Sequence, residues 1–270
     1  MVVQHNLTAM NANRQLSGVT SAQAKSTEKL SSGYRINRAA DDAAGLSISE
    51  KLRSQIRGLD KAASNSQDGI SLVQVAEGAL NETHSILQRM NELATQAAND
   101  TNTSTDRVSI QKEMDQLTSE IDRIRSTTQF NSMNLLDGTF TGMKLQVGAL
   151  SGQSIVISID NMNASSLKIS GLKVSSFSSA GKAMTAIQKA INSVSVQRSK
   201  LGAIQNRLEH TINNLNTTSE NTSAAESRIR DVDMATEMVE YSKNNILAQA
   251  GQSMLAQANQ ATQGVLSLLQ

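Results

Sequence analysis

Hydrophobic residues recur at alternating intervals of three and four along much of the chain, a spacing that gathers them on one face of a helix. The clearest run lies between residues 180 and 215. Its members lie seven residues apart: Ala180, Ile187, Val194, Leu201, Leu208 and Leu215. Met184, Ile191 and Ile212 occupy interleaved positions, which Arg198 and Gln205 interrupt. The pattern predicts a helix of roughly 60 Å whose coiled-coil-like seam is a buried bundle face.

Two further seams predict helices in the first half of the chain. The longer one contains Leu52, Ile56, Leu59, Ala63, Ile70, Val73, Leu80 and Leu87, with Ser66, Glu77 and His84 in the same register. The shorter one contains Ile110, Met114, Leu117, Ile121 and Ile124. Between them, residues 99–106 read NDTNTSTD, a polar segment rich in helix-capping residues. A chain reversal there would make the two helices an antiparallel pair.

Three glycines interrupt the longer of these helices, at Gly58, Gly69 and Gly78. Each costs about 1 kcal/mol relative to alanine in a helix interior. They either allow another element to approach closely or are costs that the helix tolerates. We favour close packing.

The hydrophobic period changes between about residues 133 and 177. Leu145, Val147 and Ala149 alternate with their neighbours, and so do Ile155, Ile157 and Ile159. The turn-forming residues 151–153 separate the two runs, which predicts a β-hairpin. We expect a third, weaker strand from Leu167 to Val174. The strand region as a whole is predicted at about 139–175.

The two ends of the chain are rich in Ala, Asn, Gln and Ser and are compatible with helices. The C-terminal end carries a stripe of Leu247, Ala250, Met254, Ala258, Ala261, Val265 and Leu268. Such small residues cannot hold a lone helix in water, so the stripe needs a partner. We expect that partner to be the N-terminal end and then other copies of the chain. The predicted fold is mainly α: a long antiparallel bundle with a small hairpin and paired termini. Its predicted parts are an N-terminal arm (1–44), a helical core (45–225) and a C-terminal arm (226–270).

Composition supports long helices and excludes several functions. The chain has 270 residues with no proline, cysteine or tryptophan, and 2% aromatic residues. The absence of proline removes the main helix breaker. The absence of cysteine excludes disulfides and zinc–thiolate sites. The formal charge of +1 gives no basic field, and aromatic residues are too few for base stacking, so we expect no nucleic-acid binding.

No run of 18 apolar residues predicts membrane insertion, and the N-terminus lacks the pattern of a cleaved signal peptide. Catalytic patterns are missing as well. His5, His84 and His210 form no metal-ligand motif. The carboxylate pairs Asp41–Asp42 and Asp231/Asp233 are poor acid–base dyads because neighbouring helical residues point in different directions. We expect no cofactor, no metal and no enzymatic activity.

Two terminal stretches resemble a known family. Residues 30–59, LSSGYRINRAADDAAGLSISEKLRSQIRGL, are similar to the N-terminal signature of bacterial flagellins, and residues 224–270 are similar to the C-terminal signature. Residues 87–100 and 120–138 also resemble the inner helices of that family. The resemblance therefore covers nearly the whole chain, with only about 45 residues between the helices where larger members insert outer domains.

The resemblance implies a subunit of the extracellular flagellar filament that serves swimming motility. It implies a helical homopolymer assembled by the terminal coiled coil, with contact residues Leu7, Leu16, Leu30, Leu247, Ala250, Met254, Ala261, Val265 and Leu268. It also implies export through the flagellar export apparatus without a cleaved signal peptide. An export chaperone on the C-terminal arm and the filament cap and hook-junction proteins are further implied partners.

Recognition by Toll-like receptor 5 is the remaining implication. In the flagellins that it detects, one helix face of pattern QRxxELAxQ and a glutamate on the next helix make the contact. The matching residues here are Gln88, Arg89, Glu92, Leu93 and Glu113. Because residues three and four apart share a helix face, we expect Arg89, Glu92 and Leu93 on one exposed face. Leu93 would flank the seam, which turns Leu87 and Ala94 inward.

Three alternatives remain at this point. A hook–filament junction protein shares the terminal seams, although the continuous match over residues 30–59 and 224–270 favours a flagellin. A helical signalling or adaptor rod would also suit the Ala-, Ser- and Gln-rich seams. An enzyme is disfavoured because the chain has no HExxH motif.

Overall fold

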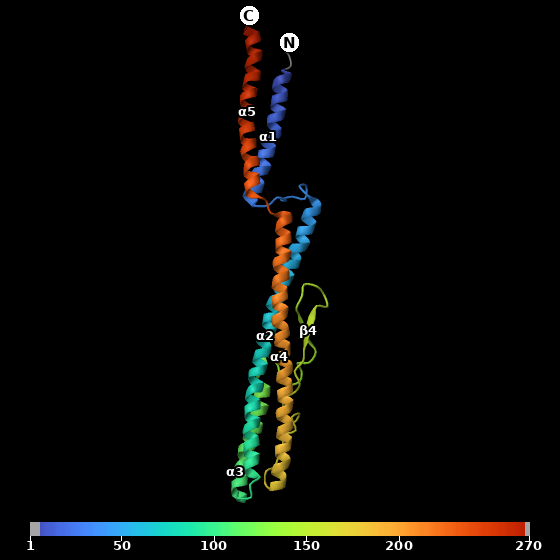
Figure 1. The fold of residues 1–270 in the computed structure, drawn as a ribbon, viewed down its shortest axis with the longest axis vertical. Coiled ribbons are helices and arrows are strands. Elements are labelled where there is room, and N and C mark those ends of the chain that lie inside the picture. The colour runs from blue at the N-terminus through green and yellow to red at the C-terminus, as the bar shows by residue number, and fades with distance from the viewer. Residues whose placement is uncertain (1–5, 268–270) are drawn as a thin grey trace. The chain divides into compact units, whose positions relative to one another are not determined.

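The computed structural model describes residues 6–267 and the side chains of residues 6–260 (Figure 1). These residues form two compact units. Unit 1 comprises residues up to 56 together with those from 221 onward, and unit 2 comprises residues 57–220. Long helices dominate both units, which confirms the predicted mainly α fold. The arm boundaries expected at residues 44 and 225 stay predictions.

Unit 1 is built on an antiparallel pair of helices, α1 (Leu7–Ser32) and α5 (Met234–Ser267) (Figure 1). Asn6 caps α1 by accepting the Ala9 N–H through its Oδ1, and its Nδ2 donates to the Ala258 carbonyl at 3.0 Å. At the opposite end of α1, the Nζ of Lys29 lies 3.3 Å from the Oε2 of Glu237. The expected pairing of the two chain ends is therefore confirmed.

The segment that follows α1 is tied to the end of α4 (Phe177–Arg230) within unit 1. Gly33 ends α1 in the left-handed conformation (φ 74°), where glycine is favoured. Tyr34 pairs with Asp231 in an isolated antiparallel bridge, and the Val232 N–H donates to the Gly33 carbonyl at 3.0 Å. The Arg230 guanidinium lies 4.6 Å from the centre of the Tyr34 ring. These bonds fix the chain path between the paired helices and the rest of unit 1.

Unit 2 contains most of α2 (Ala43–Ala97), all of α3 (Ser104–Thr127) and most of α4. The predicted α4 seam is confirmed, since all six residues spaced by seven between Ala180 and Leu215 are buried. The predicted reversal between α2 and α3 is confirmed too. Thr103 starts α3 with a capping box, in which its side chain accepts the Asp106 N–H and Asp106 accepts the Thr103 N–H. The core of the unit joins side chains of α2, α3, α4 and the segment between α3 and α4.

That segment holds two small strand pairs. β1 (Gln129–Phe130) pairs with β2 (Met133–Asn134), which was not predicted. β3 (Met143–Gln146) and β4 (Ser154–Ile157) form the predicted hairpin, with Leu145 opposite Ile155. The third strand expected from Leu167 to Val174 is wrong, because this stretch consists of turns and irregular backbone. Its apolar residues Leu167, Ile169 and Val174 are nevertheless buried in the core of unit 2.

Two of the three α2 glycines lie against the hairpin region. A Cβ on Gly58 would come within 2.9 Å of the Ala149 Cβ, and one on Gly69 would overlap Leu145 Cδ2 and lie 3.3 Å from Leu208 Cδ1. A Cβ on Gly78 would meet nothing within 4 Å. Close packing therefore explains Gly58 and Gly69, whereas Gly78 is a tolerated cost.

Candidate functional site

The face of α5 that packs against α1 is narrow and poor in large side chains. Its wholly or partly buried positions at intervals of three and four are Glu237, Tyr241, Asn244, Ala248, Gly251, Leu255 and Ala258, and Asn245 beside them is partly buried as well. The matching positions on α1 are Ala9, Ala12, Leu16, Val19, Gln23, Ser26 and Leu30, and Glu28 and Lys29 next to the last of them are partly buried as well. Both sets alternate at intervals of three and four, as in a two-stranded coiled coil. Leu16 and Leu30, two of the expected assembly residues, therefore belong to this seam inside the chain.

Of the described members of the expected C-terminal stripe, Ala258 lies on the face of α5 that packs against α1, whereas the other three do not. Leu247 is 44% exposed and Met254 61% exposed, and Ala250 between them is exposed as well. Because successive helical residues are rotated by about 100°, Leu247, Ala250 and Met254 lie roughly a quarter-turn away from the seam. The expectation that the N-terminal end of the same chain covers Leu247 and Met254 is therefore wrong. The side chains of Ala261 and Val265, and all of Leu268, lie outside the described residues.

Further apolar side chains stand exposed on the two paired helices. On α5 they are Met234, Met238, Val239 and Ile246, and on α1 they are Leu7 and Met10. Large exposed apolar patches mark interaction surfaces. We call Leu247, Ala250 and Met254 the α5 flank. The α5 flank is a candidate contact with other molecules because no described residue of unit 1 buries it.

A charged cluster lies on the exposed side of α2 and α3 in unit 2. The Arg89 guanidinium donates from Nε and Nη2 to Glu113 Oε1 at 3.0 and 2.9 Å, and from Nη1 to Glu92 Oε2 at 3.2 Å. The hydrogen bonds to Glu113 first, and to Glu92 second, raise the pKa of Arg89 above its ordinary value. The amide of Gln88 lies 3.1 Å from His84 Nε2 one turn away. The structure thus brings Gln88, Arg89, Glu92 and Glu113 to one surface.

Leu93 does not share that exposed surface, which corrects the sequence-based expectation. Its side chain is only 2% exposed and belongs to the core of unit 2. Met90, Leu93, Ala94 and Ala97 are all buried, so the apolar face of α2 is wider here than the seam alone indicates. The reason is that α3 and the segment after it pack on α2 in addition to α4. Leu93 therefore lies beneath the charged cluster.

Three of the four carboxylates singled out in the sequence, those of Asp41, Asp42 and Asp233, accept hydrogen bonds from nearby backbone groups. Asp42 Oδ1 accepts the Gly45 N–H at 2.9 Å at the start of α2. Asp41 Oδ2 accepts the Arg38 N–H at 3.0 Å, which is the main cause of its lowered pKa. Asp233 accepts from Thr236 and Ala235 at the start of α5, and its pKa is lowered mainly by the Thr236 N–H. Each of these groups has a local structural role.

Among residues 6–267, no group of His, Asp and Glu side chains could hold a metal ion. Within the same residues, no helix combines the length and apolar character needed to cross a bilayer. The functional features of the described surface are therefore the exposed apolar side chains and the charged cluster.

Family models match both halves of the chain. The model described as the bacterial flagellin N-terminal helical region matches residues 3–141, and the model of the C-terminal helical region matches residues 184–269. The chain is 56% identical to a flagellin of Halalkalibacterium halodurans over 271 residues, covering 100% of both proteins. It is 52% identical to a flagellin of Bacillus subtilis over 304 residues, again covering 100% of both.

Solved structures agree with this assignment. A crystal structure of Bacillus cereus flagellin matches with a TM-score of 0.52 and 34% identity, covering 60% of this chain and 94% of that one. A flagellar hook-associated protein from Vibrio parahaemolyticus matches with a TM-score of 0.60 at 14% identity, covering 71% of this chain and 100% of that one, a likeness of fold alone. Because family models match most of the chain and full-length identity exceeds half, the chain belongs to the bacterial flagellin family, whose members are structural proteins rather than enzymes.

Proposed function

We propose that this chain polymerises into the extracellular flagellar filament that drives swimming, and that the α5 flank is one of its contacts between subunits. The α5 flank supports this proposal most directly. It exposes Leu247 and Met254 although the α1–α5 seam is already complete without them. A contact that recurs from subunit to subunit without closing builds a helical polymer. Leu7, Leu16, Leu30, Ala261, Val265 and Leu268 remain proposed members of the wider assembly region.

The test is assembly of purified protein by salting-out, followed by electron microscopy. Leu247→Ser combined with Met254→Ser should abolish filaments, because it removes apolar area from the α5 flank alone. The matched control is Gln249→Ser with Gln252→Ser, which changes two exposed polar residues of the same helix. Circular dichroism should show unchanged helix content in both variants. Filaments of normal length from the Leu247/Met254 variant would contradict the assignment.

We further propose that the C-terminal arm is covered by an export chaperone before the chain enters the flagellar export apparatus. The support is again the exposed apolar surface of α5, which would favour aggregation while uncovered. The filament cap and the hook-junction proteins are proposed neighbours at the two ends of the polymer. A soluble 1:1 complex with the purified chaperone is expected in gel filtration. Its persistence after deletion of residues 247–270 would place the chaperone elsewhere.

We also propose recognition by Toll-like receptor 5 at the charged cluster. Gln88, Arg89, Glu92 and Glu113 supply its exposed side chains, and Leu93 supports them from beneath. Arginine is enriched among residues that dominate binding energy at interfaces. Arg89→Ala should weaken receptor binding by about 2 kcal/mol, which is roughly thirtyfold.

The matched control is Arg123→Ala, since Arg123 is an exposed α3 arginine that pairs with Glu120 in a similar way. Binding is measured with monomeric protein and the receptor ectodomain. Leu93→Ala is less informative, because it also opens a cavity in the core. Equal binding of the Arg89 variant and the control would remove this assignment.

A further inference from the structure

The distribution of charge along the chain is uneven although the net charge is close to zero. Residues 161–208 contain no Asp or Glu, yet they carry Lys168, Lys173, Lys182, Lys189, Arg198, Lys200 and Arg207. Two of these cations are paired, Arg198 with Glu77 at 3.7 Å and Lys200 with Asp160 at 3.4 Å. Among the described residues, no carboxylate lies within ion-pair distance of Lys168, Lys182 or Lys189. These three lysines are therefore free to bind an anion.

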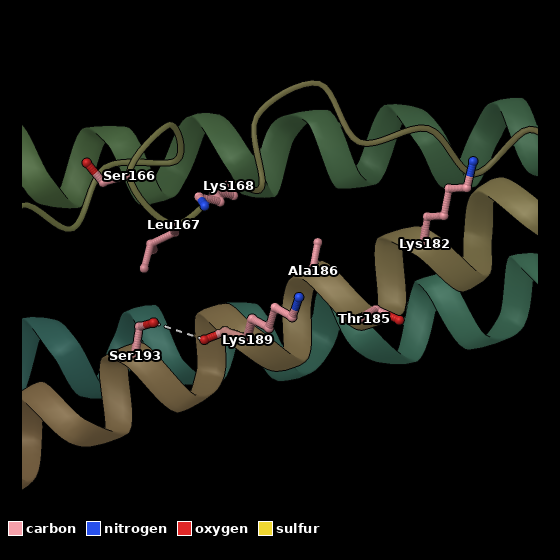
Figure 2. A pocket seen from close by; sticks show the side chains of 8 residues that line it. All are labelled: Ser166, Leu167, Lys168, Lys182, Thr185, Ala186, Lys189 and Ser193. Carbon is pink, nitrogen blue, oxygen red and sulfur yellow. Dashed lines mark hydrogen bonds between the residues drawn. The ribbon is translucent and has the colours of Figure 1, made fainter.

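The same three lysines line one groove in unit 2. Figure 2 shows Leu167 and Lys168 on the irregular segment facing Ala186 and Lys189 on α4. The groove has a volume of about 530 Å³, within the range of ligand sites, and Ser166, Thr185 and Ser193 complete its lining with Lys182. Lys182 and Lys189 lie seven residues apart on α4, which is about 10 Å along the helix axis. A ligand that satisfies both must therefore carry more than one anionic group.

The wall opposite α4 is held in place by side chains below it. Asp122 of α3 accepts the Ala164 N–H at 2.9 Å, and Asn163 accepts the Ser166 N–H. The neighbours of Lys168, Leu167 and Ile169, are both buried. Lys168 itself adopts a φ of 59°, a left-handed conformation that is uncommon for a lysine. The turn thus exposes the Lys168 ammonium group, and the surrounding residues hold the backbone of the turn in place.

A second cavity of about 410 Å³ continues the groove along α4 and shares Ser166, Leu167 and Ser193 with the first. Its other lining residues include Asn161 and Asn192, and its Asp160 carboxylate is the one paired with Lys200. The hydroxyls of Thr185 and Ser193 donate to the Gly181 and Lys189 carbonyls, so their lone pairs are available to accept. We call both cavities together the α4 groove. No aromatic residue lines it, so nucleobases would have no stacking surface.

We propose that the α4 groove binds an acidic oligosaccharide, whose sulfate or carboxylate groups pair with Lys168, Lys182 and Lys189 while its hydroxyls contact the Ser, Thr and Asn side chains. The extension of the groove along α4, its spaced cations and the hydroxyl and amide side chains among its lining residues all fit a chain of sugars better than a single small anion. Binding does not require filament assembly, so this proposal can fail while the proposed function stands.

The test uses the full-length chain as a monomer at low salt, verified by sedimentation, and a fluorescently labelled heparin hexasaccharide as the probe. Anisotropy should show saturable binding that weakens as salt is raised. Lys168→Gln with Lys189→Gln should raise the Kd about fivefold to tenfold, because each exposed ion pair contributes modestly. The matched control is Lys61→Gln with Lys144→Gln, which removes two exposed lysines of unit 2 that lie outside the α4 groove.

The proposal is supported if only the groove variant loses affinity and if a galacturonate hexasaccharide competes with the probe. It is overturned if the probe does not bind, or if both double variants weaken binding equally. Equally strong competition by inorganic sulfate would also overturn the proposal, because it would show that the groove binds single anions and does not recognise an oligosaccharide. Tighter binding of a single-stranded oligonucleotide, or loss of self-association alone in the groove variant, would assign the groove to another partner.

Discussion

At the scale of single residues, burial decides how much each apolar side chain of α4 contributes to stability. Leu201 is fully buried in the seam, whereas Val196, five residues earlier on the same helix, is 56% exposed. Leu201→Ala removes a packed side chain and leaves a cavity, so it should lower the free energy of unfolding by about 2–5 kcal/mol. Val196→Ala should change it by less than about 0.5 kcal/mol. Urea unfolding followed by circular dichroism measures both, and comparable losses would show that the seam is not the core of the bundle.

The α2 glycines allow an equally sharp comparison between two chemically identical substitutions. Gly78→Ala gains helix propensity without meeting another atom and should stabilise unit 2 by about 0.5–1 kcal/mol. Gly58→Ala meets the Cβ of Ala149 at 2.9 Å, and that Cβ has no rotatable bond with which to move aside. Overpacking of this kind typically costs about 1–3 kcal/mol, so the substitution should be destabilising. Thermal unfolding of both variants should give opposite signs, and two stabilising changes would contradict close packing at Gly58.

At the scale of elements, the start of α3 depends on an ionised carboxylate. Asp106 Oδ2 accepts from Thr103 Oγ1 at 2.7 Å and from the Thr103 N–H at 2.9 Å. The hydroxyl first, and the N–H second, lower the pKa of Asp106 below its ordinary value of 3.8. The resulting stability is present above pH 3.8 and is lost as the pH falls through the lower pKa of the folded state.

Thr103→Val keeps the shape of the side chain but removes its hydroxyl, so the pKa of Asp106 should rise toward its ordinary value. Carboxyl-carbon NMR during a pH titration measures this change. Asp233, which accepts from Thr236 at the start of α5, serves as the internal reference in the same spectra. An unchanged Asp106 titration in the variant would mean that the hydroxyl does not contribute to the cap.

Sequence patterns predict well the elements whose structure is determined by residues within the element itself. The α4 seam, the reversal before α3 and the β3–β4 hairpin are of this kind. The expected strand from Leu167 to Val174 is wrong because the backbone of its first half closes local turns onto residues 163–165, and its second half is bonded by a side chain of α3. Gln111 of α3 donates to the Leu172 carbonyl and accepts the Val174 N–H. The alternating apolar residues there anchor a loop in the core. The sequence of this stretch gives no sign that Gln111, more than 50 residues away, bonds to its backbone.

The sequence predicts which residues belong to the candidate site better than it predicts which way their side chains point. Arg89, Glu92 and Glu113 could be grouped because helical spacing and the chain reversal bring them together. The burial of Leu93 depends on packing by α3 and the segment after it, which a single seam does not reveal. The C-terminal stripe is apolar as predicted, but its residues Leu247, Ala250 and Met254 do not pack on α1. A second, weaker seam through Asn244, Ala248 and Leu255 makes the contact with α1.

At the scale of the whole molecule, the two units differ in how many apolar side chains their helices bury. Within the described residues, α4 buries nine side chains, eight of them apolar, whereas α1 buries Ser26 alone. The buried residues of α5 are Asn244 and Ala248, both small or polar. Local stability follows buried apolar contact, so unit 1 should open far more readily than unit 2. Such a difference suits a subunit whose terminal helices gain their final stability from neighbouring copies.

Amide hydrogen exchange tests this difference in both the monomer and the polymer. In the monomer, amides of α1 and α5 should exchange at least about a hundredfold faster than those of α4 between residues 180 and 215, because only the latter stand over a packed core. On polymerisation, protection should rise mainly in α1 and α5, since burial of the exposed α5 flank adds the missing apolar contact. A monomer with the Leu247→Ser and Met254→Ser changes should show the same fast exchange, because those side chains do not contact α1. Slow exchange of α1 and α5 in a proven monomer would mean that the narrow seam is sufficient by itself, and the α5 flank would then have no role in ordering the arms.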